Sequence, residues 1–172
     1  MSITLADSYY LKALNLYPYE LDQVIEALNY AISYNSEHAG ANYLLGLVNM
    51  YQLGKYVEAE NHFEKALAGD INYPETYYAY INLLIQTGDY EKALNLNDYA
   101  YNVKGINVAR LRHNEGLIAE IKGDLYKAKE YMKLAYNGSY RKNERDYLKD
   151  ELERVNSKIK SSKKQAQNNR EE

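Results

Sequence analysis

Residues that could support catalysis are present, but their spacing does not form a catalytic motif. The three histidines, His38, His62 and His113, lie far apart in the sequence and lack the spacing of metal ligands. The sequence contains no His-Glu-x-x-His run, no glycine-rich phosphate loop and no Gly-x-Ser-x-Gly turn. It also contains no cysteine, which excludes disulfides, thiol nucleophiles and thiolate-bound zinc. We therefore predict that the protein is not an enzyme and has no metal site and no cofactor.

Carboxylates are numerous, and a solvated helix face explains them better than acid–base chemistry does. Five of them fall at helical positions where exposure is expected: Glu58, Glu60, Glu64, Glu91 and Glu130. Residues 1–140 carry 11 Lys and Arg against 17 Asp and Glu, whereas residues 141–172 carry 10 against 7. Because an acidic body repels a phosphate backbone, this distribution argues against nucleic acid as the main ligand.

Tyrosine is the unusual feature of the composition, with 21 residues against one Phe and no Trp. Tyr offers a large, rigid contact area, and its hydroxyl group requires a hydrogen-bond partner when it is buried. The tyrosines are therefore candidates both for packing between helices and for a surface that binds a partner. Either use requires elements that hold the rings in place, and the internal repeats of the sequence supply them.

Three segments of the chain repeat at intervals of 34 and 35 residues. Each contains a Gly, an Ala five residues later and another Ala seven residues further on. The sets are Gly54, Ala59 and Ala66; Gly88, Ala93 and Ala100; and Gly123, Ala128 and Ala135. A Gly suits the left-handed turn that ends a helix, and Ala residues seven apart lie near one helical stripe. The pattern predicts pairs of closely packed helices joined by short turns.

Residues around each Gly mark the two helices of a pair. Upstream, apolar residues recur three or four apart, as in Tyr77, Tyr80 and Leu84, which predicts a first helix. Downstream, Asp89 and Asp124 directly follow the Gly and are expected to accept a backbone N–H at the start of the second helix.

These features resemble the tetratricopeptide repeat (TPR), a helical hairpin with a characteristic order of aromatic, Leu-Gly, Gly, Tyr, Ala, large and Ala positions. The matching residues are Leu45, Gly46, Gly54, Tyr56, Ala59, Phe63 and Ala66 in one copy; Tyr77, Gly88, Tyr90, Ala93 and Ala100 in the next; and Gly116, Gly123, Ala128, Met132 and Ala135 in the last. The resemblance implies an all-α fold, an α-solenoid of about four TPR-like helical hairpins. We expect them at about residues 1–36, 37–72, 73–106 and 107–141, the first copy being degenerate.

The repeats depart from the family pattern at three places. Gly46 and Gly54 lie one residue further apart than usual, so positions in that repeat are ambiguous by one residue. Arg112 replaces an early aromatic residue in the last copy. Asn97 stands where the other copies have Phe63 or Met132, and we expect it to be a weak point in the packing.

The end of the chain follows a different pattern. A narrow apolar stripe runs along a charged helix at Leu148, Leu152, Val155 and Ile159. We expect residues 142–161 to form a helix that caps the last hairpin, although so narrow a stripe also suits contact with a partner or a second copy. Residues 162–172 are polar and are expected to form a disordered tail.

In the TPR family the first helices line a concave groove, and the resemblance assigns residues to that groove. They are Tyr9, Tyr10, Leu44, Val48, Tyr51, Tyr78, Asn82, Gln86, His113, Asn114 and Leu117. Aromatic, amide and aliphatic side chains of this kind suit a short peptide or a partner helix. The basic residues with which some TPR domains bind the C-terminal carboxylate of chaperones are absent from this set.

The sequence therefore favours a non-catalytic adaptor or scaffold that binds a protein or peptide partner in a concave groove. One alternative is a structural subunit, or a homodimeric component, of a larger bacterial assembly. A second is nucleic-acid contact through the basic tail, at Lys158, Lys160, Lys163 and Lys164. No apolar run is long enough to cross a membrane and no signal peptide is recognisable, so we expect a cytoplasmic protein.

Overall fold

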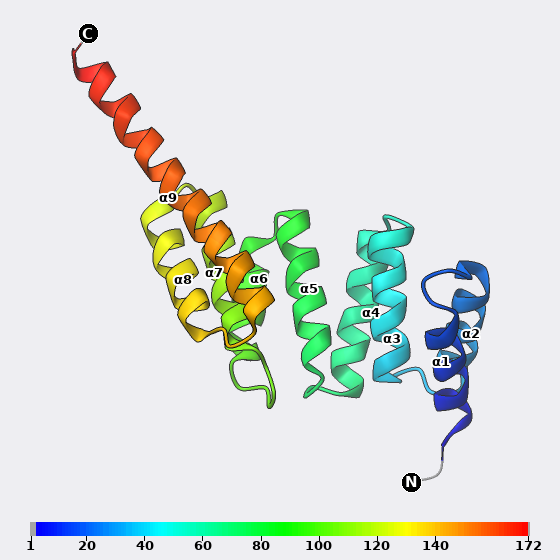
Figure 1. Cartoon of the computed structure of the whole chain (residues 1–172). Coiled ribbons are helices and arrows are strands. Elements are labelled where there is room, and N and C mark those ends of the chain that lie inside the picture. Colours follow the sequence, from blue (N-terminus) through cyan, green and yellow to red (C-terminus); the bar gives the residue numbers. More distant parts are fainter. Residues whose placement is uncertain (1–2, 172) are drawn as a thin grey trace. The chain divides into compact units, whose positions relative to one another are not determined.

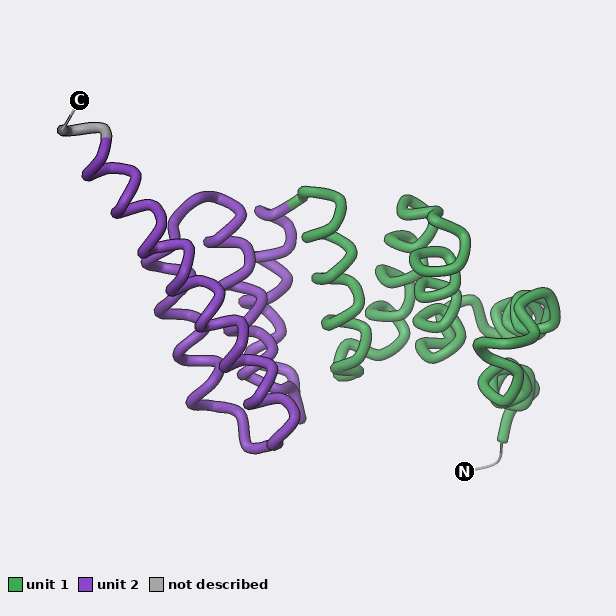
Figure 2. The backbone as a smooth tube through the Cα atoms, turned by 45° about the horizontal axis from the view of Figure 1, so that its top comes forward, with its two compact units in different colours: residues 1–89 green, residues 90–172 purple. Residues whose placement is uncertain are grey.

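The elements of the protein are helices joined by short turns, in a computed structural model that describes residues 3–171 (Figure 1). The chain divides into unit 1, Met1–Asp89, and unit 2, Tyr90–Glu172 (Figure 2). This boundary falls inside segment 73–106, which we predicted to be a single repeat, so the division into four repeats stays a prediction. None of the described helices combines the length and the apolar content needed to cross a bilayer.

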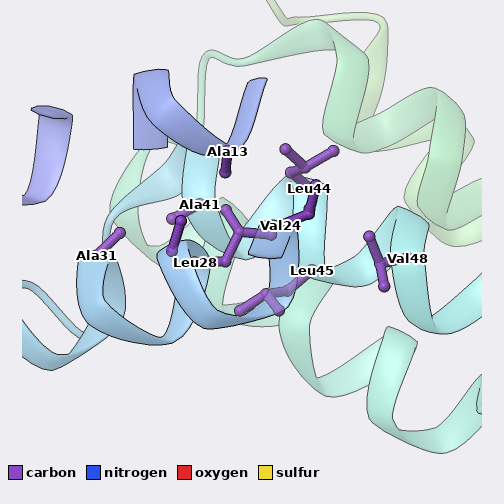
Figure 3. Packing of buried hydrophobic residues seen from close by; sticks show 9 residues of the cluster. Ala13, Val24, Leu28, Ala31, Ala41, Leu44, Leu45 and Val48 are labelled. Carbon is purple, nitrogen blue, oxygen red and sulfur yellow. The ribbon is translucent and has the colours of Figure 1, made fainter. Parts of the chain in front are cut away.

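Unit 1 contains two helix pairs followed by a further helix. α1 (Leu5–Leu16) pairs with α2 (Leu21–Tyr34). α3 (Ala39–Leu47), extended by the π-helical segment η1 (Val48–Gln52), pairs with α4 (Tyr56–Gly69). α5 (Pro74–Thr87) packs against α4. The core between the first pair and α3 consists of small and branched apolar side chains, eight of which are labelled in Figure 3: Ala13, Val24, Leu28, Ala31, Ala41, Leu44, Leu45 and Val48.

Unit 2 consists of α6 (Tyr90–Ala100), α7 (Val108–Ile121), α8 (Leu125–Gly138) and the long α9 (Lys142–Glu171). α7 and α8 form a helix pair, α6 packs against α7, and α9 packs against α8. The second Ala of the predicted motif is fully buried here as in unit 1, at Ala135 and Ala66. These small residues therefore lie within the packing between helices.

In each of two helix pairs, a Gly in the first helix makes room for a large side chain of the second helix. A β-carbon built on Gly46 would lie 2.4 Å from Cε1 of Phe63, and one on Gly116 would lie 3.0 Å from Cε of Met132. Phe63 and Met132 are fully buried. The Leu-Gly position of the repeat is thus explained by packing.

The predicted turns form as expected. Gly88 ends α5 with a φ of 84°, and Gly123 has a φ of 85° after α7, both in the left-handed region that a β-carbon disfavours. The carboxylate of Asp124 then accepts the backbone N–H of Lys127 at 3.0 Å and caps α8.

η1 absorbs the extra residue between Gly46 and Gly54. The backbone N–H of Leu53 donates to the carbonyl of Val48 at 3.1 Å, five residues back, which widens the last turn of the helix. The side chain of Asn49 donates to the carbonyl of Leu45 at 2.8 Å. The insertion lies after Leu47. Residues up to Leu47 therefore correspond to α5 residues 35 positions later, and not to those 34 positions later.

The apolar stripe of α9 is buried within unit 2. Leu148 packs with Ala109 and Ala135, and Val155 and Ile159 pack with a cluster that includes Met132. Leu148, Val155 and Ile159 are 2%, 0% and 8% exposed. The stripe therefore covers the α7–α8 pair of its own chain, as a capping helix does, and does not face solvent as a surface for a second copy.

The segment that we expected to be a disordered tail is helical as far as the structure describes it. α9 continues to Glu171, and residues 160–168 are exposed along it. Lys, Gln and Ala have good helix propensity and no Pro or Gly follows Ser161, so the helix that is nucleated by the packed part continues. Glu172 lies outside the described residues.

Candidate functional site

Two residues from the predicted groove meet on the surface of unit 1. The side-chain amide of Asn82 on α5 donates to the hydroxyl of Tyr51 on η1 at 2.9 Å. Asn82 is exposed, and Tyr51 is 52% exposed. Tyr78 and Gln86 lie one helical turn before and after Asn82 on α5, Tyr78 half-buried and Gln86 exposed. We call Tyr51, Tyr78, Asn82 and Gln86 the α5 patch.

Two other groove predictions are corrected by the structure. Leu44 and Val48 are 2% and 0% exposed and belong to the core shown in Figure 3. Because the extra residue lies after Leu47, the positions that the repeat pattern assigns to the groove fall one residue earlier, at Tyr43 and Leu47. Both of these side chains are half-buried. The larger spacing between the glycines was the sequence signal, but it did not show on which side of the extra residue each position lies.

Tyr9 and Tyr10 of the predicted groove pack against other helices of unit 1. The ring of Tyr9 stacks on those of Tyr30 and Tyr34 of α2, with centroids 5.0 and 5.8 Å away. The ring of Tyr10 lies 5.1 Å from that of His38 and would meet any β-carbon on residue 40. Burial raises the pKa of the Tyr10 hydroxyl. Both rings are half-buried and serve mainly as packing between helices.

The histidines of unit 1 have structural partners. Nδ1 of His38 accepts the backbone N–H of Ala41 at 3.0 Å, so Nε2 carries the proton and donates to Asp7 at 3.1 Å. Nδ1 of His62 lies 3.0 Å from the side-chain oxygen of Asn42. Across the described part of the chain, no group of three or more His, Asp or Glu side chains is arranged to hold a metal ion.

In unit 2, α9 covers two of the three predicted groove residues. His113 lies between the ring of Tyr147, 5.4 Å away, and the carboxylate of Glu151, 3.6 Å from Nε2. Leu117 packs against the cluster that contains Val155. These side chains are therefore occupied by the chain's own last helix.

The third predicted residue, Asn114, belongs to a buried polar network between α6 and α7. Its amide donates to the side-chain oxygen of Asn97 at 3.3 Å, and Asn97 is fully buried. Glu115, 6% exposed, accepts hydrogen bonds from Arg112 at 2.9 Å and Tyr101 at 3.1 Å. Asn97, which we expected to be a weak point in the packing, is thus part of a hydrogen-bonded network. In the sequence, this polar network is marked by Asn97 and Arg112, the two residues that depart from the apolar repeat pattern.

Ion pairs connect α9 with α7. Arg154 binds Glu120 through two nitrogens and Glu151 at 2.7 Å, and Lys158 lies 2.7 Å from Glu120. Burial opposes ionisation of Glu120, but the hydrogen bonds from Arg154 and Lys158 hold its pKa below the ordinary value. Of the four lysines that we assigned to the basic tail, Lys158 therefore has a carboxylate partner within its own unit.

A shallow, largely open depression that the sequence reasoning missed lies along the exposed face of α2. Its volume is about 470 Å³, and its lining residues are Asp22, Ile25, Glu26, Asn29, Tyr30 and Ser33. They recur at intervals of three and four, so they share one helix face opposite the buried residues Val24 and Leu28. We call this hollow the α2 trough.

Two family models match the chain. The tetratricopeptide repeat model matches residues 50–98, and the model of a domain of unknown function, DUF6340, matches residues 79–169, more than half of the chain. No curated protein sequence matches it.

Solved structures resemble the chain in fold. PilF of Pseudomonas aeruginosa matches with a TM-score of 0.77 and 20% identity over 91% of this chain and 70% of PilF. A double mutant of MamA from RS-1 matches with a TM-score of 0.74 and 18% identity, over 96% of this chain and 92% of the MamA chain. YrrB is described as a TPR protein with an unusual peptide-binding site. It matches with a TM-score of 0.66 and 24% identity, over 78% of this chain and 69% of the YrrB chain. Identities this low show the fold alone.

Proposed function

The chain belongs to the DUF6340 family and is a TPR protein, and from this premise we propose that it is a non-catalytic adaptor that binds a peptide or helix of a protein partner on the α5 patch. The all-α TPR-like fold is the one that we predicted from the repeats. TPR proteins are generally non-catalytic and typically mediate protein–protein interactions.

The hydrogen bond between Asn82 and Tyr51 is the observation that supports this site. It holds two exposed side chains from neighbouring first helices in a fixed arrangement, which lowers the entropic cost of binding. An amide has one acceptor and two N–H donors, and within the described residues Asn82 uses one donor for Tyr51. Its carbonyl and second N–H suit the backbone of an extended peptide. The α5 patch carries no formal charge at neutral pH, which favours an uncharged segment.

Selection of peptides from a random library on the wild-type chain tests the proposal. We expect selected peptides to lose at least about tenfold in affinity, about 1.4 kcal/mol, when Tyr51→Ala and Asn82→Ala are combined. The reason is that truncation removes the ring that supplies contact area and the amide that pairs with the backbone. Isothermal titration calorimetry with one selected peptide measures the change.

A matched control carries Tyr140→Ala and Asn137→Ala, which remove the same side-chain types from exposed positions of unit 2. Its affinity should stay within about twofold of the wild type, because neither side chain belongs to the α5 patch. Circular dichroism should show equal helix content in all three proteins. Equal peptide affinity in the wild type and the Tyr51/Asn82 variant would remove the α5 patch as the binding site.

A further inference from the structure

The α2 trough combines acidic and apolar groups on one exposed helix face. Asp22 and Glu26 are exposed and one helical turn apart, and neither makes an ion pair within the described residues. Ile25 and Tyr30 supply apolar surface between and beside them. A surface of this kind suits a helix that presents cations one turn apart on aliphatic stems.

One of the side chains that line the trough, Tyr30, packs against a neighbouring helix. Tyr30 is 47% exposed, yet its ring stacks on that of Tyr9 of α1, 5.0 Å away and inclined by 23°. Tyr9 also stacks on Tyr34, 5.8 Å away. This arrangement fixes Tyr30 before any ligand arrives, so binding loses little side-chain entropy, and the exposed part of the ring can receive a cation.

The chain itself carries a helix with the complementary chemistry. The packed part of α9 ends at Ile159, and residues 160–168 are helical and exposed. Lys160 and Lys164 lie one turn apart on this segment, with the same spacing as Asp22 and Glu26. We call residues 160–168 the α9 end.

We propose that the α2 trough binds the α9 end of a second copy of this chain. Lys160 and Lys164 pair with Asp22 and Glu26, and the lysine stems cover Ile25 and Tyr30. The spacing of charges on the two helices supports a second copy over an unrelated basic helix, because one sequence supplies both halves of the contact. Since the trough and the α9 end are different surfaces, each copy offers one of each, and the association can continue beyond a dimer.

Sedimentation velocity of the full chain tests the proposal. At low ionic strength the average mass should rise as the protein concentration is raised from micromolar to near-millimolar. At physiological ionic strength, where the Debye length is about 8 Å, the rise should be much smaller because exposed charges are screened. A mass that stays monomeric over the whole low-salt series would overturn the proposal, and so would association that is equal at both ionic strengths.

Charge reversal identifies the surfaces. The variant D22K/E26K and the variant K160E/K164E should each remain monomeric at low salt, because each places like charges opposite one another. The chain that carries all four substitutions should associate again, since the pairing is restored with the signs exchanged. Failure of the fourfold variant to associate would contradict direct pairing of these residues.

Matched controls exclude a general effect of net charge. K129E/K133E on α8 changes the net charge as K160E/K164E does, at exposed lysines one turn apart. D146K/D150K on α9 matches D22K/E26K in the same way. Both controls should associate like the wild type. If K129E/K133E and K160E/K164E abolish association equally, the attraction is non-specific and the proposal fails.

Discussion

Glu115 is buried in unit 2, where it accepts hydrogen bonds from Arg112 and Tyr101. A buried carboxylate is tolerated because charged and polar donors satisfy it. Asn97 completes the network at the place where other copies of the repeat have Phe63 or Met132. Burial and the neighbouring charge of Glu115 raise the pKa of the Tyr101 hydroxyl, so Tyr101 acts as a hydrogen-bond donor at neutral pH. These residues join α6 to α7 through polar contacts where an apolar core would otherwise do so.

We predict that Glu115→Ala destabilises the protein by about 2–3 kcal/mol. The substitution leaves the Tyr101 hydroxyl without its acceptor, leaves the Asn97 amide with only the carbonyl of Leu111, and opens a cavity. Arg112, 36% exposed, recovers water as a partner. Urea unfolding followed by circular dichroism measures the free energy of unfolding.

The double variant Glu115→Ala with Arg112→Met provides the comparison. If the ion pair stabilises the fold, Glu115→Ala should cost less in the Arg112→Met background than in the wild type, because the attraction between the two charged groups is already absent there. Glu130→Ala, at an exposed position of α8, should change the stability by less than about 0.5 kcal/mol. Equal costs in both backgrounds would show that the charge of Arg112 does not contribute.

The helix pairs depend on close contact between a small residue in the first helix and a large one in the second. In the α3–α4 pair the contact is between Gly46 and a rigid ring, and in the α7–α8 pair it is between Gly116 and the flexible end of a Met side chain. The two pairs have the same design but differ in how far the larger partner can move.

We predict that Gly46→Ala destabilises the protein by about 1–3 kcal/mol, because the added methyl group overlaps with Phe63, whose ring is fully buried and cannot turn aside. Phe63→Leu in the same chain should recover part of this loss by making room for the methyl group. Thermal unfolding of the single and double variants measures both effects.

Gly116→Ala is the matched control in the other pair. Its methyl group would approach Cε of Met132 at 3.0 Å, and Met adapts to small changes in volume. We expect this substitution to be tolerated better than Gly46→Ala, and the higher helix propensity of Ala offsets part of its cost. A larger loss at Gly116 than at Gly46 would contradict this account of the packing.

His62 and His113 link the stability of the whole molecule to pH. Burial lowers the pKa of each below the ordinary value, and for His113 the nearby Glu151 opposes this only in part. A histidine with a lowered folded-state pKa binds protons more readily when the chain is unfolded. Its full contribution to stability is therefore present above about pH 6.5 and is lost as the pH falls below that value.

We predict that the melting temperature falls between pH 7.5 and pH 5.5. The carboxylates with lowered pKa values, Asp7, Glu120 and Glu151, stay ionised across this range and therefore do not cause the change. In the variant His62→Gln with His113→Gln the melting temperature should depend less on pH, because neither replacement titrates. Differential scanning calorimetry at several pH values measures the difference, and an identical slope in both proteins would rule out these two histidines.

The repeat itself determined the helical fold, because its spacing encodes contacts between neighbours in the chain. Gly88 and Gly123 adopt the left-handed turns, and Ala66 and Ala135 are fully buried, at the positions that the repeat pattern indicates. The sequence also placed Tyr51 and Asn82 in one predicted groove, because both occupy groove positions of successive repeats, and the two side chains are hydrogen-bonded.

The tertiary structure decided how the remaining side chains are used. A one-residue insertion can be absorbed at more than one place in a helix, and only the formation of η1 moved Leu44 and Val48 into the core. Whether His113 faces a partner or α9 depends on where a helix distant in sequence packs, which no local pattern encodes. The sequence alone thus predicted an all-α fold built of helix pairs, whereas long-range packing decided which of the predicted groove side chains stay exposed.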